Sequence, residues 1–63
     1  MNYPEAYTKL SDMKATLSFT FGQPGNRGYV AYYRTPDRKR WALSNGDWSD
    51  VGPMVWTVEP API

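Results

Sequence analysis

The chain has 63 residues, a formal net charge of +1, no Cys and no His, and aromatic residues make up 16% of it. Disulfides and metal sites built from thiolate or imidazole ligands are therefore excluded, and one small domain covering residues 1–63 must obtain its stability mainly from buried rings. The commonest general base and the best nucleophile are also missing, and no nucleophile elbow or phosphate loop occurs, so we expect no enzymatic activity, no metal and no cofactor.

The first element that the sequence predicts is a helix from Asn2 to Lys14. Asn2 is a preferred N-cap residue, Pro4 suits the first turn, and Glu5 stands three residues after the cap, where its side chain completes a capping box. The apolar positions recur at helical spacing and share one face: Tyr3, Ala6, Tyr7, Leu10 and Met13. A helix of this length needs packing against another element, so we expect it to lie on a sheet.

The second predicted element is a strand from Lys14 to Phe21, in which apolar and polar residues alternate strictly. Strict alternation predicts one buried face and one solvated face. The buried face is expected to consist of Ala15, Leu17, Phe19 and Phe21. A turn follows this strand, because Pro24-Gly25 is typical of type II turns.

The next strand is expected to begin at Gly28, and it carries aromatic rings on both of its faces. Val30 and Tyr32 point one way, whereas Tyr29 and Tyr33 point the other way. Two hypotheses account for this pattern. Either the strand is central in a sheet and the helix covers one of its faces, or one face is a binding surface.

A turn is predicted at Thr35–Arg38, because a proline and an aspartate stand at its centre. The third strand, Arg40–Ser44, follows and directs Trp41 and Leu43 inward. Asn45-Gly46 is the strongest short turn pattern in the chain and ends this strand.

The fourth strand is expected at Met54–Val58, and Pro60 and Pro62 end it. Spaced prolines suit the edge of a sheet, because they discourage further pairing. Short connections between four strands favour an antiparallel meander. The predicted fold class is therefore α+β, with a short N-terminal helix packed on a four-stranded, mostly antiparallel sheet.

Five of the seven basic residues stand between Arg27 and Trp41, and the segment after them carries only acidic charges. One interpretation is that the two segments neutralise each other at the surface, and the other is that the basic segment contacts a partner. Asp47 and Asp50 are expected to support a turn rather than to form a catalytic pair. A calcium loop is not expected, because Asp50 and Trp56 occupy the positions of its Gly and its final Glu.

Two candidate binding surfaces lie around the predicted hairpin. Tyr, Trp and Arg dominate the energetics of protein interfaces. The candidate protein-binding surface consists of Tyr29, Tyr33, Arg34, Arg38, Arg40 and Trp48. Basic side chains beside aromatic rings are also typical of proteins that bind single-stranded nucleic acid. The candidate nucleic-acid surface consists of Arg27, Tyr29, Tyr33, Arg34, Lys39 and Arg40.

Several short motifs in the C-terminal half form a familiar pattern. They are Tyr29-Val30-Ala31-Tyr32-Tyr33, Arg40-Trp41, Gly46-Asp47, Pro53-Met54-Val55-Trp56 and Pro60-Ala61-Pro62. Over residues 28–62 the pattern resembles a family of short phage and prophage proteins of unknown function, which have a Val-Ala-x-Tyr strand and a Trp followed by spaced prolines. Val55 stands where the members usually have His. The resemblance implies a small phage-type accessory protein in the cytoplasm of a bacterial host, and it implies no catalytic residues.

We therefore expect a non-enzymatic protein that binds a host or phage protein and inhibits or redirects it. The alternatives are a single-stranded nucleic-acid-binding β module and a small structural subunit of a phage particle, whose sheet edge pairs with neighbouring copies. A homo-oligomer is compatible with each of them. No segment is long and apolar enough to cross a membrane and no signal peptide is present, so we expect no membrane partner and a cytoplasmic location.

Overall fold

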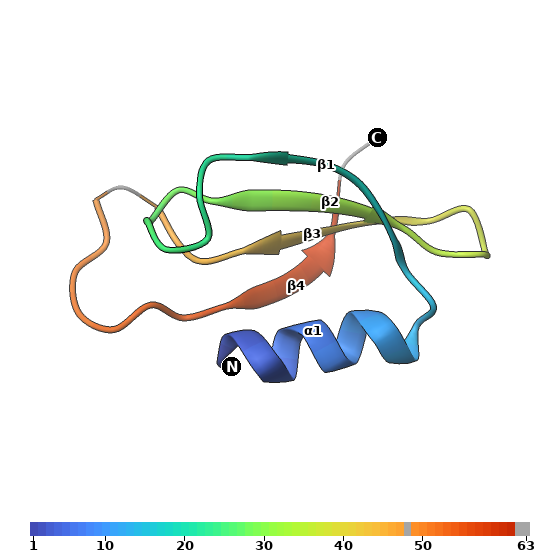
Figure 1. Ribbon diagram of the computed structural model, residues 1–63, viewed down its shortest axis with the longest axis horizontal. Helices are drawn as coiled ribbons and strands as arrows, with labels where there is room; N and C mark the ends of the chain where they lie inside the picture. Colours follow the sequence, from blue (N-terminus) through green and yellow to red (C-terminus); the bar gives the residue numbers. More distant parts are fainter. Residues whose placement is uncertain (48, 62–63) are drawn as a thin grey trace.

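The computed structural model describes residues 1–47 and 49–61 (Figure 1), so Trp48 and Pro62, which carry predictions above, lie outside the described residues. One helix precedes a four-stranded antiparallel sheet, and the strands lie side by side in the order β1-β2-β3-β4. The elements are α1 (Tyr3–Asp12), β1 (Thr16–Phe21), β2 (Val30–Arg34), β3 (Arg40–Ser44) and β4 (Thr57–Pro60). The predicted α+β fold, a helix and an antiparallel meander, is confirmed.

Local hydrogen bonds define both ends of α1. The Asn2 side chain accepts from the Glu5 amide at 2.9 Å, and the Glu5 carboxylate accepts from the Asn2 amide at 3.3 Å, so the predicted capping box is present. At the other end Lys14 has a φ of 57°. Its amide donates to the Ser11 carbonyl at 2.9 Å, and the following amide donates to the Leu10 carbonyl at 3.0 Å. These are the bonds of a Schellman motif, in which glycine usually takes the left-handed position.

The hydrophobic core lies between α1 and one face of the sheet. Its buried members are Ala6, Leu10, Tyr29, Ala31, Leu43, Trp56 and Val58. Two backbone hydrogen bonds between Met1 and Trp56, of 2.9 Å and 3.3 Å, hold the start of α1 beside the segment that leads into β4. Trp41 packs against this core as predicted, with its indole Nε1 buried and without a hydrogen-bond partner in the described part of the chain. β2 is central in the sheet, as one of the two hypotheses states, and its Ala31 is buried in this core, whereas α1 itself packs mainly on β4.

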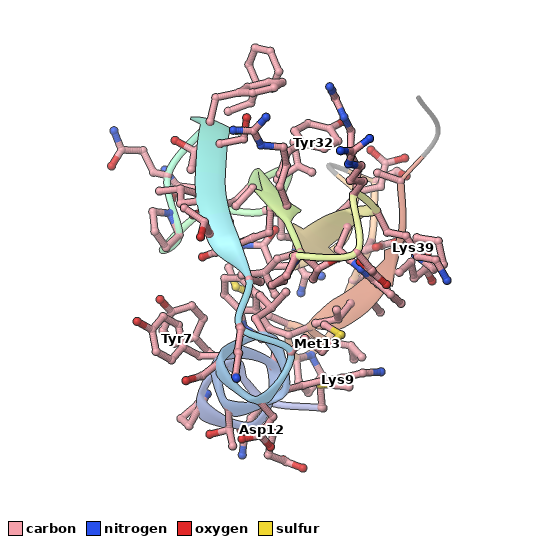
Figure 2. All side chains as sticks on the ribbon, turned by 90° about the vertical axis from the view of Figure 1, so that its right-hand side faces the viewer. Tyr7, Lys9, Asp12, Met13, Tyr32 and Lys39 are labelled. Carbon is pink, nitrogen blue, oxygen red and sulfur yellow. The ribbon has the colours of Figure 1, made fainter. Side chains whose placement is uncertain are left out.

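The opposite face of the sheet carries no covering element among the described residues (Figure 1). Figure 2 shows Tyr32 on the side of the sheet away from α1 and Met13 next to the helix. Side chains alternate along a strand, so the pairing register assigns the remaining members of this uncovered face. We call it the open face, and it comprises Thr16, Phe19, Phe21, Val30, Tyr32, Arg34, Arg40, Ala42, Ser44, Thr57 and Glu59.

The prediction of a buried face for the first strand is wrong. All six residues of β1 are exposed. The pairing register shifts between Leu17 and Phe19, so Leu17 faces Tyr33 on the helix side while Phe19 faces Tyr32 on the open face. An extra residue in one strand produces this change of side, as a β-bulge does. The physical reason for the exposure is that α1 packs on β4, at the far edge of the sheet from β1.

The turn at Gln23–Asn26 is closed by a hydrogen bond of 3.0 Å from the Asn26 amide to the Gln23 carbonyl. Gly25 is not among the residues with positive φ. The prediction of a type II turn is therefore wrong, because that turn requires a positive φ at its third residue. A turn forms at the predicted place with a different backbone conformation.

The fourth strand begins at Thr57 rather than at Met54, and it ends with Pro60, two residues beyond the predicted Val58. The start is late because the Trp56 amide bonds the Met1 carbonyl rather than β3. Pro60 is tolerated because β4 is an edge strand, where a missing amide donor leaves no ladder partner unsatisfied. Asn45-Gly46 directly follows the end of β3, as predicted, and the late start of β4 lengthens the loop between the two strands.

Candidate binding surface on the open face

Three aromatic side chains contact one another on the open face. The centroids of the Phe19 and Tyr32 rings are 4.8 Å apart at an interplanar angle of 32°, and those of Phe19 and Phe21 are 5.4 Å apart and almost perpendicular, at 87°. Phe19 is nevertheless 47% exposed and Phe21 is 59% exposed. We call Phe19, Phe21 and Tyr32 the ring cluster. It leaves large aromatic surfaces in water, in a chain that depends on its rings for a core.

Arg34, at the end of β2, and Arg40, at the start of β3, are direct cross-strand partners, and both are exposed. Like charges directly opposite each other in a sheet are destabilising. The two arginines also line, together with Phe19 and Tyr32, a hollow of about 180 Å³. The charged groups and the ring cluster therefore form one continuous surface.

The turn between β2 and β3 holds a third arginine in an unusual conformation. The Arg38 amide donates to the Thr35 carbonyl at 3.0 Å, and the Thr35 amide donates to the Lys39 carbonyl at 3.1 Å. Arg38 has a φ of 68°. A turn followed by a left-handed residue is a common hairpin connection, and glycine usually takes that last position.

The carboxylate of Asp37 is occupied within this turn, as the sequence predicts. It accepts hydrogen bonds from the Thr35 hydroxyl and, at 3.3 Å, from the Lys39 amide. The bond from the Thr35 hydroxyl is the main reason why the pKa of Asp37 is lowered. Asp37 therefore stabilises the turn that presents Arg38.

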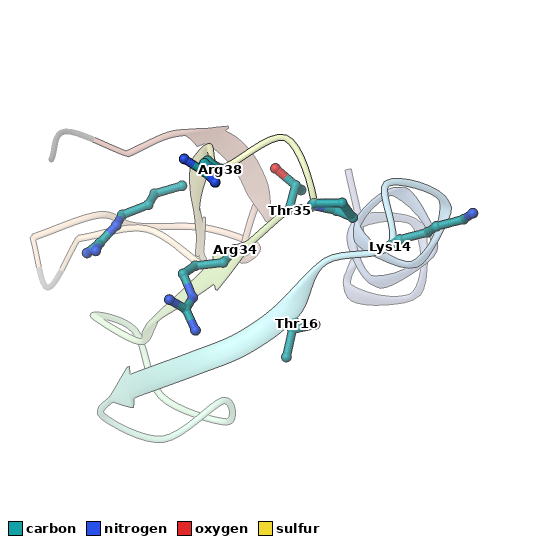
Figure 3. Close-up of a pocket in the computed structure, with 7 residues that line it drawn as sticks. Lys14, Thr16, Arg34, Thr35 and Arg38 are labelled. Atoms are coloured by element: carbon teal, nitrogen blue, oxygen red, sulfur yellow. The ribbon is translucent and has the colours of Figure 1, made fainter.

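Beyond the ring cluster, at the turn end of the sheet, lies a second hollow of about 460 Å³ (Figure 3). Its walls consist of Lys14, Thr16, Arg34, Thr35, Pro36, Arg38 and Arg40. Figure 3 shows Arg34 and Arg38 extending on the same side of the hollow, whereas the Lys14 ammonium points away from them. No Asp or Glu is among the described residues that line it. The hollow is therefore suited to an anion.

The structure brings together some of the residues of the two surfaces predicted from the sequence and places others apart. Tyr29 is 8% exposed, and its ring meets that of Trp56 in the core at 5.8 Å. Tyr33 is half-buried on the same helix side, and burial raises the pKa of both tyrosines. Arg34 and Arg40 lie on the open face instead. Tyr29 therefore lies apart from these two arginines, whereas Tyr33 borders the smaller hollow together with them.

The remaining predicted residues lie around the hairpin and the opposite loop. Arg38 and Lys39 are exposed in the turn. The Arg27 guanidinium donates to the Gly52 carbonyl, in the loop between β3 and β4. Trp48 is outside the described residues.

Sequence reasoning missed the ring cluster, although a pattern in the chain could have revealed it. The only predicted helix has ten residues in the structure and buries two side chains, Ala6 and Leu10. A helix of this size cannot cover the apolar positions of four strands. Because Tyr32 was placed on the opposite side of its strand from Tyr33, the face left uncovered could have been identified as that of Tyr32.

A second missed residue supports the loop before β2. Asn45 is fully buried, and its side-chain oxygen accepts from the Tyr29 amide at 3.1 Å. Its side-chain nitrogen donates to the carbonyls of Asn26, at 2.7 Å, and Pro24, at 3.3 Å. Asn45 therefore joins the end of β3 to the loop that follows β1, a role that the Asn-Gly dipeptide does not indicate.

The acidic pair of the β3–β4 loop supports local structure, as expected. The Asp50 carboxylate accepts from the Asp47 amide at 2.8 Å, and the Asp50 amide donates to the Asp47 carbonyl at 3.1 Å. Within residues 1–47 and 49–61, no three acidic, His or Cys side chains come together as metal ligands would. The one helix described there is also too short to cross a bilayer.

Comparison of the chain with protein-family models, with curated proteins and with solved structures finds no match. The open face is therefore the feature of the molecule that indicates a function.

Proposed function

We propose that this protein is a non-enzymatic module that binds single-stranded nucleic acid on its open face. The observation that carries the proposal is the ring cluster beside Arg34 and Arg40 on a face that no described element covers. Bases stack on exposed aromatic rings, and guanidinium groups neutralise the phosphates between them. The proposal keeps the nucleic-acid hypothesis of the sequence and replaces its two tyrosines on the helix side, the buried Tyr29 and the half-buried Tyr33, by the ring cluster.

The charge around the rings favours a nucleic acid over a protein partner. Three arginines gather at one end of the open face, and the residues described as lining the hollow there include no carboxylate. The carboxylate of the open face, Glu59, stands on the edge strand β4 opposite Ala42. An anionic partner with flat apolar groups matches both features, and a single-stranded nucleic acid has both. Binding to a host or phage protein, a role in a particle and a phage origin stay predictions from the sequence.

The test is fluorescence anisotropy with labelled poly-dT and poly-rU strands of about ten nucleotides at low salt. The informative variant is the double substitution Phe19→Ala with Tyr32→Ala. The matched control is Tyr7→Ala, because Tyr7 is a 53% exposed ring on α1, outside the open face. Stacking contributes about 1–3 kcal/mol per base, so the double variant should bind at least about 30-fold more weakly, and the control should bind like the wild type.

The salt dependence provides an independent check. If each of the three arginines neutralises one negative charge of the strand, the logarithm of the affinity should fall with the logarithm of the salt concentration with a slope of about −2. The absence of binding to either strand at low salt would refute the proposal. So would capture of a protein that survives nuclease treatment and requires Phe19 and Tyr32, because the open face would then be a protein interface.

A further inference from the structure

The hollow at the turn end of the sheet brings three arginines together at one end of the open face. We infer that Arg34, Arg38 and Arg40, the arginine cluster, bind the terminal phosphate of the nucleic-acid strand. The inference rests on the proposed function and deepens it, because it assigns one end of the ligand to one end of the open face.

The arginine cluster is adjacent to the ring cluster. Arg34 and Arg40 line the hollow beside Phe19 and Tyr32 and also line the larger hollow at the turn. A base stacked on the ring cluster would therefore have its nearest phosphate at the arginine cluster. A strand that follows the open face reaches the turn at the end of the sheet, where Thr35 and Pro36 form part of the wall.

The charge of the arginine cluster matches that of a terminal phosphate. A phosphate monoester carries about 1.5 to 2 negative charges near neutral pH, compared with one for a phosphodiester inside a strand. The arginine cluster provides three guanidinium groups, and the nearest turn carboxylate, that of Asp37, is already held by Thr35 and Lys39. Guanidinium groups also match phosphate oxygens in a bidentate geometry. The doubly charged terminal group is therefore the better fit.

The arrangement of the three arginines is unfavourable without a bound anion. Arg34 and Arg40 are directly opposite each other in the sheet, which places two like charges side by side. Arg38 occupies a left-handed position that glycine would adopt more easily. Both features disfavour the free protein, and a bound phosphate would relieve the charge repulsion.

The experiment compares three oligonucleotides of one sequence: with a 5′ phosphate, with a 3′ phosphate, and with a hydroxyl at both ends. We expect one phosphorylated form to bind the wild-type protein about tenfold more tightly than the hydroxyl form, the gain of one charge-assisted hydrogen-bonded pair. The preferred end defines the direction of the strand.

Two variants test the assignment to the arginine cluster. Arg38→Gly removes one guanidinium and suits the local backbone, and Arg34→Gln removes another. In both, the preference for the terminal phosphate should fall below about twofold. Lys9→Gln, which removes a positive charge from the exposed surface of α1, should keep it. Thermal melting of each variant establishes that it is folded.

The possible failures are distinguishable. If the wild-type protein binds all three oligonucleotides equally, the terminal-phosphate site is refuted and strand binding stands. If it binds none of them, the proposed function fails together with the inference. If Lys9→Gln loses the preference as fully as Arg38→Gly does, the effect comes from overall charge and the assignment to the arginine cluster is refuted.

Discussion

Replacing Arg38 by glycine should make the protein more stable while weakening its binding to phosphate. Arg38 has a φ of 68°, where the Cβ of any L-residue approaches the following carbonyl oxygen. That conformation costs about 1–2 kcal/mol, and glycine avoids it. Glycine also makes the unfolded chain more flexible, which opposes the gain by about 0.4–1 kcal/mol. The net stabilisation expected for Arg38→Gly is therefore about 0.5–1 kcal/mol.

The measurement is thermal unfolding followed by circular dichroism, with Arg38→Ala as the matched comparison. In a domain of this size 1 kcal/mol corresponds to about 4–8 °C in Tm, so Arg38→Gly should raise the Tm by roughly 2–8 °C. Arg38→Ala removes the same guanidinium but retains a Cβ, so it should unfold about 0.5–1 kcal/mol more easily than Arg38→Gly. Lys14→Gly should stabilise in the same way, because Lys14 has a φ of 57°. Equal stability of the glycine and alanine variants at position 38 would show that backbone strain is absent there.

Three further changes test the core and the charge arrangement. Asn45→Ala should lower the free energy of unfolding, measured in urea, by about 2–4 kcal/mol, because it leaves the Tyr29 amide buried without its acceptor. A loss below about 0.5 kcal/mol would contradict the role of Asn45 as that acceptor. Burial raises the pKa of Tyr29 and of Tyr33 above the unfolded value, so their contribution to stability is complete below about pH 10 and is lost as the pH rises through the higher folded-state pKa. The urea midpoint of the wild-type protein should therefore fall in alkaline solution, and that of Tyr29→Phe should fall less steeply. A midpoint that does not change with alkaline pH would exclude this contribution of the tyrosines. Arg40→Glu should raise the Tm, because it converts a like-charge pair with Arg34 into an opposite-charge pair worth about 0.2–1 kcal/mol. An unchanged Tm would mean that the two side chains do not interact.

The sequence was sufficient for the parts of the fold that local chemistry decides. The capping residues Asn2 and Glu5 define the start of α1, and the turn before Lys39 forms where Pro36 and Asp37 stand. Each of these features depends on residues a few positions apart. Short connections between β1, β2 and β3 then leave an antiparallel meander as the simplest arrangement.

The errors concern contacts between residues that are distant in the sequence. The β-bulge after Leu17 moves Phe19 to the other face, and nothing in the alternation of β1 indicates where an extra residue will be accommodated. The late start of β4 depends on the pairing of Trp56 with Met1, across 55 positions of the chain. Such pairings follow from the packing of the whole molecule and have no local pattern.

The predicted binding surface combines residues whose side chains belong to two faces, and the sequence contains the information to group them by face. Tyr33 and Arg34 are neighbours in one strand, so their side chains must point to opposite faces of the sheet. The predicted surface therefore draws on both sides of β2. Applying this rule consistently would have grouped Arg34 with Tyr32, the residue that the structure places beside Phe19.

Several departures from what would best stabilise this small domain lie close together. Exposed rings, two arginines directly opposite each other and a left-handed arginine all occur on the open face or at the turn beside it. A chain of 63 residues has little stability to spare, because so much of its surface stays in contact with water. Features that lower the stability of the free protein and lie together are most simply explained by a ligand that compensates for them when it binds. An anion with stacked bases would cover the rings, separate the opposed charges and use the Arg38 guanidinium at once.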